Sequence, residues 1–461
     1  MTPGSPFASL LAALAAALLS AAPVLSPLAG PALLVPGNPV TADAVAAPAP
    51  DARGLAAAVD PALDGSPGTV AAQVRDAATG EVLYARDADA LAAPASSLKV
   101  LTAAAALRTL GPERTLRTRV VAVPGGSGAD DDAATELVLV GGGDVLLGDG
   151  ASDPDAVAGR AGLGTLAERT VAGLVADGVT GEVVLSVDLR LFEGDPVNPA
   201  WAPEDLEDGH VSALQPLAAW GGREAPGVDE ERIPDPAAHA ALVLQDRLRE
   251  EIQRTGADLE LGVREAIPAT EADRADVVVA EPVAQVESAP VADVAAYMLA
   301  HSENQVAEAL GHVAAYAVGR PATHDGAARL LEDVAADLGA DTAGMELLDA
   351  SGLAEGARVS PAQLAAVVSA AARVPWLAPV LDGLPRPGED STLDERFRGT
   401  AAEDAVAAKT GTLDHTVSLT GTVRTADGRV LAFSVIASDL DWRLDEARAA
   451  VDEAVTAMAG R

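Results

Sequence analysis

The stretch SSLKVLTAAAALRTLG, from Ser96 to Gly111, contains the strongest structural signal in this chain of 461 residues. Its apolar residues recur at helical spacing, its residue types favour helix, and its terminal glycine is typical of a helix end. A helix that begins at the first residues of this stretch places Ser96 and Lys99 in its first turn. Side chains three residues apart share a helix face, so the Lys99 amine can reach the Ser96 hydroxyl.

Lysine is rare in this sequence, which has 29 arginines but only two lysines, Lys99 and Lys409. A GC-rich coding bias explains the rarity of lysine, but it does not explain where the two lysines lie. Arginine stays protonated and cannot accept a proton, whereas a lysine loses its proton more readily when it is buried or close to another cation. A site that needs a nitrogen base therefore cannot use arginine instead.

Two short motifs supply candidate catalytic groups. In Ser96-x-x-Lys99, a neutral amine can take the proton of the serine hydroxyl and make it a nucleophile. By itself this motif is more often a helix cap followed by a solvated lysine. In Ser302-Glu303-Asn304, the hydroxyl can relay a proton between Lys99 and a leaving group, and the amide can donate to a substrate carbonyl. This motif, too, is by itself more often a helix cap.

A third motif, Lys409-Thr410-Gly411-Thr412, has the residue types of a substrate-binding strand. Lys409 and Thr410 can bind a substrate carboxylate through charge and hydroxyl, and Gly411 permits the close approach of a substrate backbone. The backbone N–H groups of Thr412 and Ser96 can form an oxyanion hole. An exposed strand lysine is the alternative for this motif alone, but the three motifs together use every lysine of the chain, which favours one shared site.

The composition excludes several other classes of function. With a formal net charge of −38, the surface repels a phosphate backbone, so no nucleic-acid partner is expected, and we interpret the acidity as an aid to solubility. The absence of cysteine excludes disulfides and thiolate catalysis. There are six histidines but no His-x-x-x-His or His-Glu-x-x-His pair, so neither a metal nor another cofactor is expected.

The N-terminal residues have the features of an export segment. We expect a signal peptide or anchor over residues 1–36 and a linker over residues 37–60. The apolar run Ser9–Pro23 has signal-peptide length, and Ala44 is a candidate cleavage site. No Lys or Arg precedes Arg53, so an uncleaved anchor is the alternative.

Both ends of the remaining chain carry strand patterns. Two apolar stretches flank the turn AATG within residues 68–89, and three strand-like segments followed by an amphipathic helix fill residues 404–460. We expect these ends to form one antiparallel sheet with helices packed on it. Residues 112–286 carry strand-like pieces (LRTRVVAV, ELVLVGG, GEVVLSVD, ADVVVAEPVAQV) and one clear helix over 236–256, which is typical of inserted material. The expected fold class is mixed α/β (α+β).

In their order along the chain, the motifs Ser-x-x-Lys, Ser-x-Asn and Lys-Thr-Gly resemble those of the penicillin-binding proteins and serine β-lactamases. Further stretches, including LVGGGDVLL, LLDASGL and EDSTLDERF, resemble one branch of these proteins. This branch is the D-alanyl-D-alanine carboxypeptidase/endopeptidase family of the penicillin-binding protein 4 type (peptidase family S13). The likeness runs from about residue 50 to the C-terminus. It implies a transpeptidase-like catalytic domain formed by residues 61–111 and 287–461, with one or more domains inserted at residues 112–286.

The resemblance implies a serine DD-peptidase outside the cytoplasm, in the cell envelope. Ser96 would attack the carbonyl between two D-alanines of a peptidoglycan stem peptide, and the terminal D-alanine would leave, protonated through Lys99 and Ser302. Water would then hydrolyse the acyl-enzyme. Endopeptidase action on crosslinks and acylation by β-lactam antibiotics are implied too, with Asn304 and Lys409–Thr412 binding the substrate. No cofactor is implied, and membrane contact is expected only through the N-terminal segment.

The sequence departs from the family pattern at three positions. Glu303 replaces the usual aspartate, and we interpret it as a spacer that leaves activity intact. Ala350 and Ser391 stand where glycine is usual, which is expected to affect loop geometry and substrate preference more than the chemistry. Two alternatives stay open at this point. One is a β-lactamase or esterase on the same scaffold, which the missing Glu-x-x-Leu-Asn stretch and the long insert disfavour. The other is a non-catalytic wall-binding protein, which the retention of both lysines disfavours.

Overall fold

The structure is a computed structural model that describes residues 47–123, 134–228, 230–271, 277–278 and 280–461. The export segment expected over residues 1–36, the candidate cleavage site Ala44 and the start of the expected linker lie outside these residues. Among the described residues no single helix is long and apolar enough to cross a membrane, although one sharply bent helix pair, Pro361–Arg373 with Pro375–Asp382, meets the criterion of length and composition.

The expectation of a linker over residues 37–60 is wrong at its C-terminal end. Helix α3 (Ala52–Asp64) begins there, and the Asp51 side chain caps it by accepting a hydrogen bond from the Gly54 backbone N–H at 2.8 Å. The helix buries Leu55 and Val59 in the core. The Ala-rich composition that suggested a linker is therefore that of an amphipathic helix, which packs against its neighbours.

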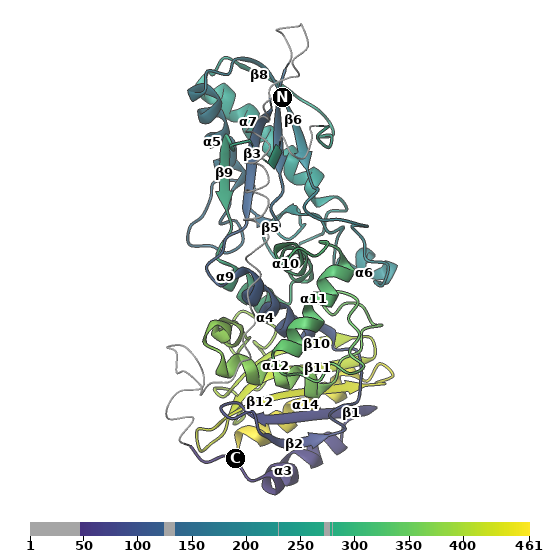
Figure 1. Cartoon of the computed structure of the whole chain (residues 1–461). Helices are drawn as coiled ribbons and strands as arrows, with labels where there is room; N and C mark the ends of the chain where they lie inside the picture. Colours follow the sequence, from purple (N-terminus) through teal and green to yellow (C-terminus); the bar gives the residue numbers. More distant parts are fainter. Residues whose placement is uncertain (1–46, 124–133, 229, 272–276, 279) are drawn as a thin grey trace, which may run out of the picture. The chain divides into compact units, whose positions relative to one another are not determined.

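The expected antiparallel sheet, built from both ends of the chain, is confirmed (Figure 1). Its strand order is β10-β11-β12-β1-β2, and every neighbouring pair is antiparallel. The central strand β12 pairs with β1, which joins residues near the end of the described chain to residues near its start. The strands are β1 (Thr69–Asp76), β2 (Val82–Arg86), β10 (Val406–Leu413), β11 (Thr416–Arg424) and β12 (Val430–Ser438).

Helices cover both faces of this sheet because its strands are apolar on both sides. Along β12, Leu431 and Phe433 pack with α3 and α14 (Leu444–Ala459), whereas Ala432 and Ile436 face the opposite core. This alternation is the period of two that a strand imposes. The opposite core holds η1 (Ala95–Leu98), α4 (Lys99–Leu110), α9 (Val291–His301), α10 (Asn304–Ala317), α11 (His324–Asp337), α12 (Pro361–Arg373), η2 (Pro375–Leu377) and α13 (Ala378–Asp382).

The helix expected from Ser96 begins as the 3₁₀ turn η1 and continues as α4 from Lys99. It ends at Leu110, and Gly111 follows with a φ of 84°, a conformation that glycine adopts at little cost. The four alanines of residues 103–106 are almost completely buried, so α4 runs through the core with close neighbours on every side. The first turn of α4 is consequently held firmly from the sheet side and from the helix side.

A second sheet lies within residues 112–287, with the order β8-β6-β4-β3-β9 and a mixture of parallel and antiparallel pairs. It has a core of its own with helices α5 (Leu163–Ala176) and α7 (Pro236–Thr255). A small parallel pair, β5 with β7, and the short helix α6 complete this part. The remaining bounds are β3 (Arg117–Val123), β4 (Thr135–Val140), β5 (Asp144–Leu147), β6 (Gly181–Asp188), α6 (Pro203–Glu207), β7 (Leu217–Ala219), β8 (Leu259–Gly262) and β9 (Ala284–Glu287).

Most of the sequence predictions for this part are confirmed, one expected strand is shorter in the described residues, and one helix was not predicted. Three of the expected strands form β3, β4 and β6, and the expected helix forms α7, which ends at Gly256 in the left-handed conformation. Of the strand expected over residues 275–286, the described residues form a strand only in β9, and residues 277–278 are helical. Helix α5 was not predicted; its two glycines, Gly164 and Gly173, weaken the helix signal.

Candidate active site

The turn that carries Ser96 has an unusual backbone. Ala95 has a φ of 49°, a value that residues other than glycine seldom adopt. Gly352 crosses directly behind this turn with a φ of 79°, and a Cβ atom added to it would lie 2.0 Å from the Ala95 carbonyl oxygen. Only glycine fits there. The turn leaves Ser96 half-buried, while Lys99 is completely buried.

Two buried serines attach this turn to the sheet. The Ser418 hydroxyl donates to the Pro94 carbonyl at 2.7 Å. The Ser97 hydroxyl lies 2.8 Å from the Ser418 hydroxyl. Opposite Ser418 on the neighbouring strand lies Gly411, where an added Cβ would be 2.2 Å from the Ser418 hydroxyl and 3.0 Å from the Ser96 backbone nitrogen. Gly411 thus lets β10 pack directly against η1, which brings the third motif beside the first.

Lys99 lies at the centre of the site. Its Nζ contacts three oxygens: Ser96 Oγ at 2.8 Å, Asn304 Oδ1 at 2.6 Å and the Ser351 carbonyl at 2.8 Å. The amide and carbonyl oxygens can only accept, so in the neutral amine they take both N–H groups. The remaining lone pair of the nitrogen then faces the Ser96 hydroxyl. The structure therefore orients Lys99 to accept the proton of Ser96.

The protonation of Lys99 suits a base at neutral to slightly alkaline pH. Burial lowers the pKa of Lys99 from its ordinary value to about 8, although the negative charges of Asp349, Glu308 and Glu303 oppose this by raising it. At pH 7 about one molecule in ten then has a neutral amine. The alternative of a solvated lysine is wrong, because the Lys99 side chain has no exposed surface.

Lys409 is also completely buried, so it is not an exposed strand lysine. Burial lowers the pKa of Lys409 well below its ordinary value, and the positive charges of Lys99 and Arg396 lower it further. Its Nζ donates to the Thr410 carbonyl at 2.9 Å, and the Thr410 hydroxyl donates to that of Thr392 at 2.9 Å. Thr392 was not among the expected residues, and it extends the polar edge of β10.

Two of the expected site residues, Ser302 and Thr412, make no hydrogen bond to Ser96 or Lys99 in the described part of the chain. Ser302 ends α9 in the left-handed conformation with a φ of 57°, and its hydroxyl makes no hydrogen bond within the described part of the chain. Thr412 is exposed on β10, opposite Val417 of β11. Of the second motif, the structure therefore connects Asn304 to Lys99, but it leaves the Ser302 hydroxyl without a partner among the described residues.

The interpretation of Glu303 as a spacer is wrong. Glu303 is buried, and its Oε1 accepts hydrogen bonds from Arg223 at 2.6 Å and from Arg232 at 2.9 Å. Burial acts to raise the pKa of Glu303, but the charges of the two arginines outweigh it and hold this pKa below its ordinary value. Arg232 also donates to the Gly221 and Gly209 carbonyls at 2.6 and 2.7 Å. Glu303 is therefore the centre of a buried ion-pair cluster.

The neighbours of Glu303 are held by the same stretch of residues 112–286. The Asn304 Nδ2 donates to the His210 carbonyl at 3.0 Å. The Gln305 amide donates to the Ala213 carbonyl and accepts from the Ser212 backbone N–H, both at 3.1 Å. The loop that carries the second motif is thus fixed by residues outside the expected catalytic segments.

The two positions without the usual glycine are accommodated locally. The Glu308 Oε1 accepts from the backbone N–H groups of Ala350 and Ser351 at 3.0 and 2.8 Å, which fixes the carbonyl that faces Lys99. Gly311 on α10 makes room for Ala350, because a Cβ on Gly311 would lie 2.7 Å from that of Ala350. Ser391 forms a turn in which its hydroxyl accepts from the Leu393 N–H at 3.3 Å.

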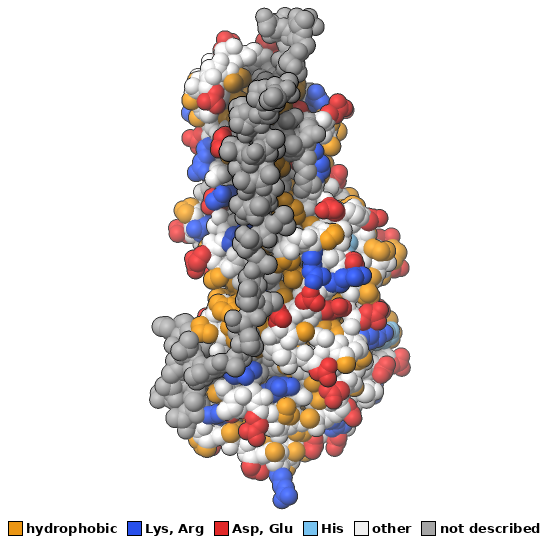
Figure 2. Space-filling view, viewed as in Figure 1, with side chains coloured by type: hydrophobic (Ala, Val, Ile, Leu, Met, Phe, Trp, Pro, Cys, Tyr) orange, Lys and Arg blue, Asp and Glu red, His pale blue; other side chains and the backbone are white. Residues whose placement is uncertain are grey.

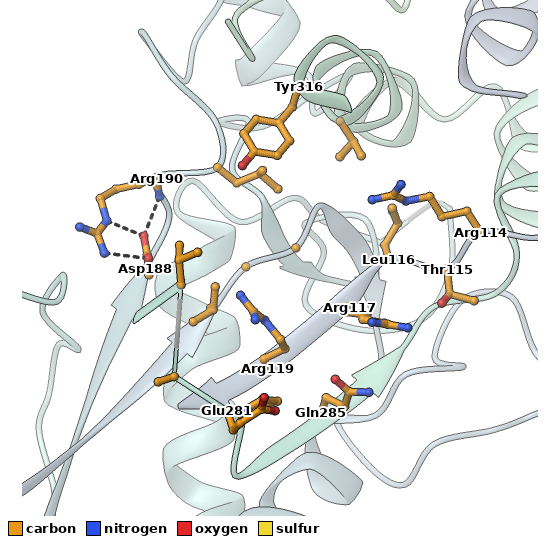
Figure 3. A pocket seen from close by; sticks show the side chains of 18 of the residues that line it. Arg114, Thr115, Leu116, Arg117, Arg119, Asp188, Arg190, Glu281, Gln285 and Tyr316 are labelled. Carbon is orange, nitrogen blue, oxygen red and sulfur yellow. Dashed lines mark hydrogen bonds and ion pairs between the residues drawn. The ribbon is translucent and has the colours of Figure 1, made fainter. Parts of the chain in front are cut away.

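A large hollow of the described surface lies away from the three motifs. It has a volume of about 900 Å³ and lies between β3, the end of β6 and helix α10 (Figure 3). Arg114, Arg117, Arg119 and Tyr316 line it, and Arg190 is paired there with Asp188. None of the motif residues lines this hollow. Figure 2 shows that acidic side chains are spread over the visible face rather than gathered into one patch.

Comparison with known proteins agrees with this site. Residues 55–246 and 230–458 match the D-Ala-D-Ala carboxypeptidase 3 (S13) family. A carboxypeptidase of Mycobacterium tuberculosis is 35% identical over 399 residues, which cover 85% of this chain and 81% of the relative. The carboxypeptidase DacB of Mycolicibacterium smegmatis is 34% identical over 428 residues, which cover 91% and 87%. The crystal structure of penicillin binding protein 4 from Haemophilus influenzae has a similar fold, with a TM-score of 0.65 at 19% identity, covering 86% of this chain and 97% of that one.

The fold and the match to the family define a serine peptidase of the penicillin-binding class. More narrowly, the chain belongs to the D-Ala-D-Ala carboxypeptidase 3 (S13) family. The fold class and the enzyme class expected from the sequence are thereby confirmed.

Proposed function

We propose that this chain cleaves the D-alanyl-D-alanine bond of peptidoglycan stem peptides through an acyl-enzyme on Ser96. The observation that carries this proposal is the geometry of Lys99, whose two fixed acceptors direct its lone pair at the Ser96 hydroxyl. As Ser96 Oγ bonds to the carbonyl carbon, its proton passes to Lys99. The C–N bond breaks, and the amine of the terminal D-alanine takes up that proton as it leaves. Water then cleaves the ester and restores the serine.

The leaving amine needs a proton donor on its own side of the bond, and Ser302 is the proposed relay. Its hydroxyl has no partner among the described residues, so it is free to rotate between Lys99 and the leaving nitrogen. Its left-handed backbone is the kind of unusual conformation that is retained at functional sites.

The substrate is bound along β10. Lys409 and Thr410 attract the terminal carboxylate, and Gly411 permits the close approach of its backbone. The backbone N–H groups of Ser96 and Thr412 stabilise the oxyanion, a contribution of about 2.7–4 kcal/mol for each donor in known cases. Asn304 uses its Oδ1 and one N–H within the protein, so its second N–H is available for a substrate carbonyl.

The proposal also divides the chain into a catalytic domain and an inserted part. Residues 61–111 and 287–461 form the catalytic domain, and residues 112–286 form the inserted part, whose separate core supports this division. The enzyme acts outside the cytoplasm, where its substrate lies. It also hydrolyses the D-alanyl crosslinks between stem peptides, and β-lactams acylate Ser96 because their amide resembles the same bond.

Labelling with a fluorescent penicillin tests this function. We expect covalent labelling of the full chain, no labelling of Ser96→Ala, and unchanged labelling of Ser66→Ala, whose serine lies in the turn before β1. Release of D-alanine from a peptide ending in D-Ala-D-Ala should follow the same pattern. Equal labelling of Ser96→Ala would contradict the proposed nucleophile. Rapid turnover of a chromogenic cephalosporin would instead indicate a β-lactamase, and folded protein without any labelling would indicate a non-catalytic binding protein.

A further inference from the structure

Behind the Ser96–Lys99 site lies a second group of chemically active side chains. Glu308 and His312 are one turn apart on α10, and His324 is the first residue of α11. Glu308 and His312 are almost completely buried, and His324 is 9% exposed. Each of the three residues offers one potential ligand atom, and these atoms lie within 4.8 Å of one another. The proposed peptidase chemistry uses none of these side chains as a reacting group.

Several polar atoms of this group lack hydrogen-bond partners. The Glu308 Oε2 and both ring nitrogens of His324 are buried without one among the residues that the structure describes. His324 Nδ1 lies 3.5 Å from Glu308 Oε2, which is longer than an ordinary N–H···O hydrogen bond. Buried polar groups in native proteins are nearly always satisfied. Of these three atoms, His324 Nδ1 faces Glu308 Oε2, and an ion bound between these two would satisfy both.

His312 has the hydrogen bonding of a metal ligand. Its Nδ1 lies 2.9 Å from the Glu308 carbonyl, which can only accept, so Nδ1 carries the proton. Nε2 therefore keeps its lone pair. Histidines that bind metals generally donate their other ring N–H to a carbonyl or carboxylate in this way. The other oxygen of the Glu308 carboxylate, Oε1, is held in place by the backbone N–H groups of Ala350 and Ser351.

The group also has room for water beside it. His312 lines a hollow of about 230 Å³ together with Phe192, Asp195 and Gln215. A hollow of this size holds several water molecules. Of the three residues, His312 is the one that lines this hollow, so a water held there approaches the group from the side of His312 and is a candidate fourth ligand.

We propose that Glu308, His312 and His324 bind one divalent metal ion, for which Zn²⁺ is the best match. Two imidazoles and a carboxylate, with a water in the fourth position, are a donor set that zinc accepts in tetrahedral geometry. Zinc bonds of about 2.0–2.1 Å place neighbouring ligand atoms about 3.3 Å apart. Glu308 Oε2 and His324 Nδ1 are already close to this separation, at 3.5 Å. The other pairs of ligand atoms lie within 4.8 Å of one another, and small side-chain rotations bring them to the same separation.

This proposal reverses the expectation that no metal is bound. That expectation rested on the absence of paired-histidine motifs, whereas here the two histidines come from different helices. The ion would anchor α10 to α11 and fix the Glu308 carboxylate. Glu308 in turn holds the backbone of Ser351, whose carbonyl accepts from Lys99. The site is therefore a structural support for the loop behind the catalytic lysine.

The test is a metal-binding measurement on the untagged full chain, stripped with a chelator and then titrated with Zn²⁺ against a chromophoric competitor. We expect one tight site per chain, and a visible absorption band of tetrahedral Co²⁺ when Co²⁺ is used instead. His312→Gln and His324→Gln should each weaken binding at least about tenfold. His239→Gln, which removes a histidine on α7 outside this group, should bind like the wild type.

The wild-type titration decides the question even if a variant does not fold. Absence of a stoichiometric site in the wild type would overturn the proposal. So would one tight site that survives unchanged in folded His312→Gln and His324→Gln chains, because the ion would then be bound elsewhere. Neither readout depends on peptidase activity, so the outcome is independent of the proposed function.

Discussion

The protonation of Lys99 makes a quantitative prediction about the rate at which Ser96 is acylated. Only the neutral amine can take the serine proton, so the rate should follow the neutral fraction of Lys99. With its pKa lowered to about 8, this fraction is about 9% at pH 7 and about 91% at pH 9. The second-order rate constant for acylation should therefore rise about tenfold between these two pH values and level off above them.

The matched variant is Lys99→Arg, which keeps the positive charge but cannot act as a base. Removal of general-base catalysis costs about 10²–10⁴-fold in rate, and the remaining rate should lose its rise with pH. The assay is a time course of labelling by a fluorescent penicillin, stopped with denaturant and read on a gel at each pH. Circular dichroism of both proteins shows whether they are folded.

Two results would refute this reasoning. One is a wild-type rate that is flat from pH 7 to 9, because the lone pair of Lys99 would then not control the reaction. The other is a folded Lys99→Arg protein that is acylated within a few-fold of the wild-type rate and with the same pH profile.

Three further predictions concern residues around Lys99. Lys409→Arg should keep part of the acylation rate, since its proposed role is electrostatic, and a loss as large as that of Lys99→Arg would contradict this role. Glu303→Gln should lower the free energy of unfolding by about 3–5 kcal/mol, because it removes the negative charge that pairs with both Arg223 and Arg232 in the described part of the chain. Urea unfolding measures this, and a change below about 1 kcal/mol would show that the cluster does not stabilise the loop. Gly352→Ala should reduce the acylation rate more than about tenfold. The added Cβ would lie 2.0 Å from the Ala95 carbonyl oxygen and would displace the turn that carries Ser96. Wild-type labelling kinetics in this variant would show that the turn tolerates the displacement.

The sequence was sufficient to predict the features that depend on neighbouring residues. Strand alternation and a turn signal define the hairpin of β1 and β2, and the spacing of Ser96 and Lys99 follows from the first turn of a helix. The order of the three motifs then indicated a shared site, and the structure brings Lys99 into contact with Ser96 and Asn304.

The features that the sequence did not reveal depend on contacts between distant segments. The partners of Glu303 lie about 70–80 residues before it, in a stretch that carries no recognisable motif. The group of Glu308, His312 and His324 becomes visible only when α10 and α11 are packed together. Helix α3 was read as a linker because an Ala-rich amphipathic helix and an Ala-rich linker have similar composition, and the burial of Leu55 is what separates them.

The pairing of β1 with β12 bears on how the newly made protein becomes active. The ribosome produces the Ser96 turn early, but the strand with Lys409 follows some three hundred residues later, and β12, which seals the central sheet, follows later still. Until these strands are made, β1 has no β12 to pair with, and the Ser96 turn has no β10 beside it. A polypeptide that ends before β12 therefore lacks a strand that this sheet needs, and we expect no acylation of Ser96 until that strand has been made.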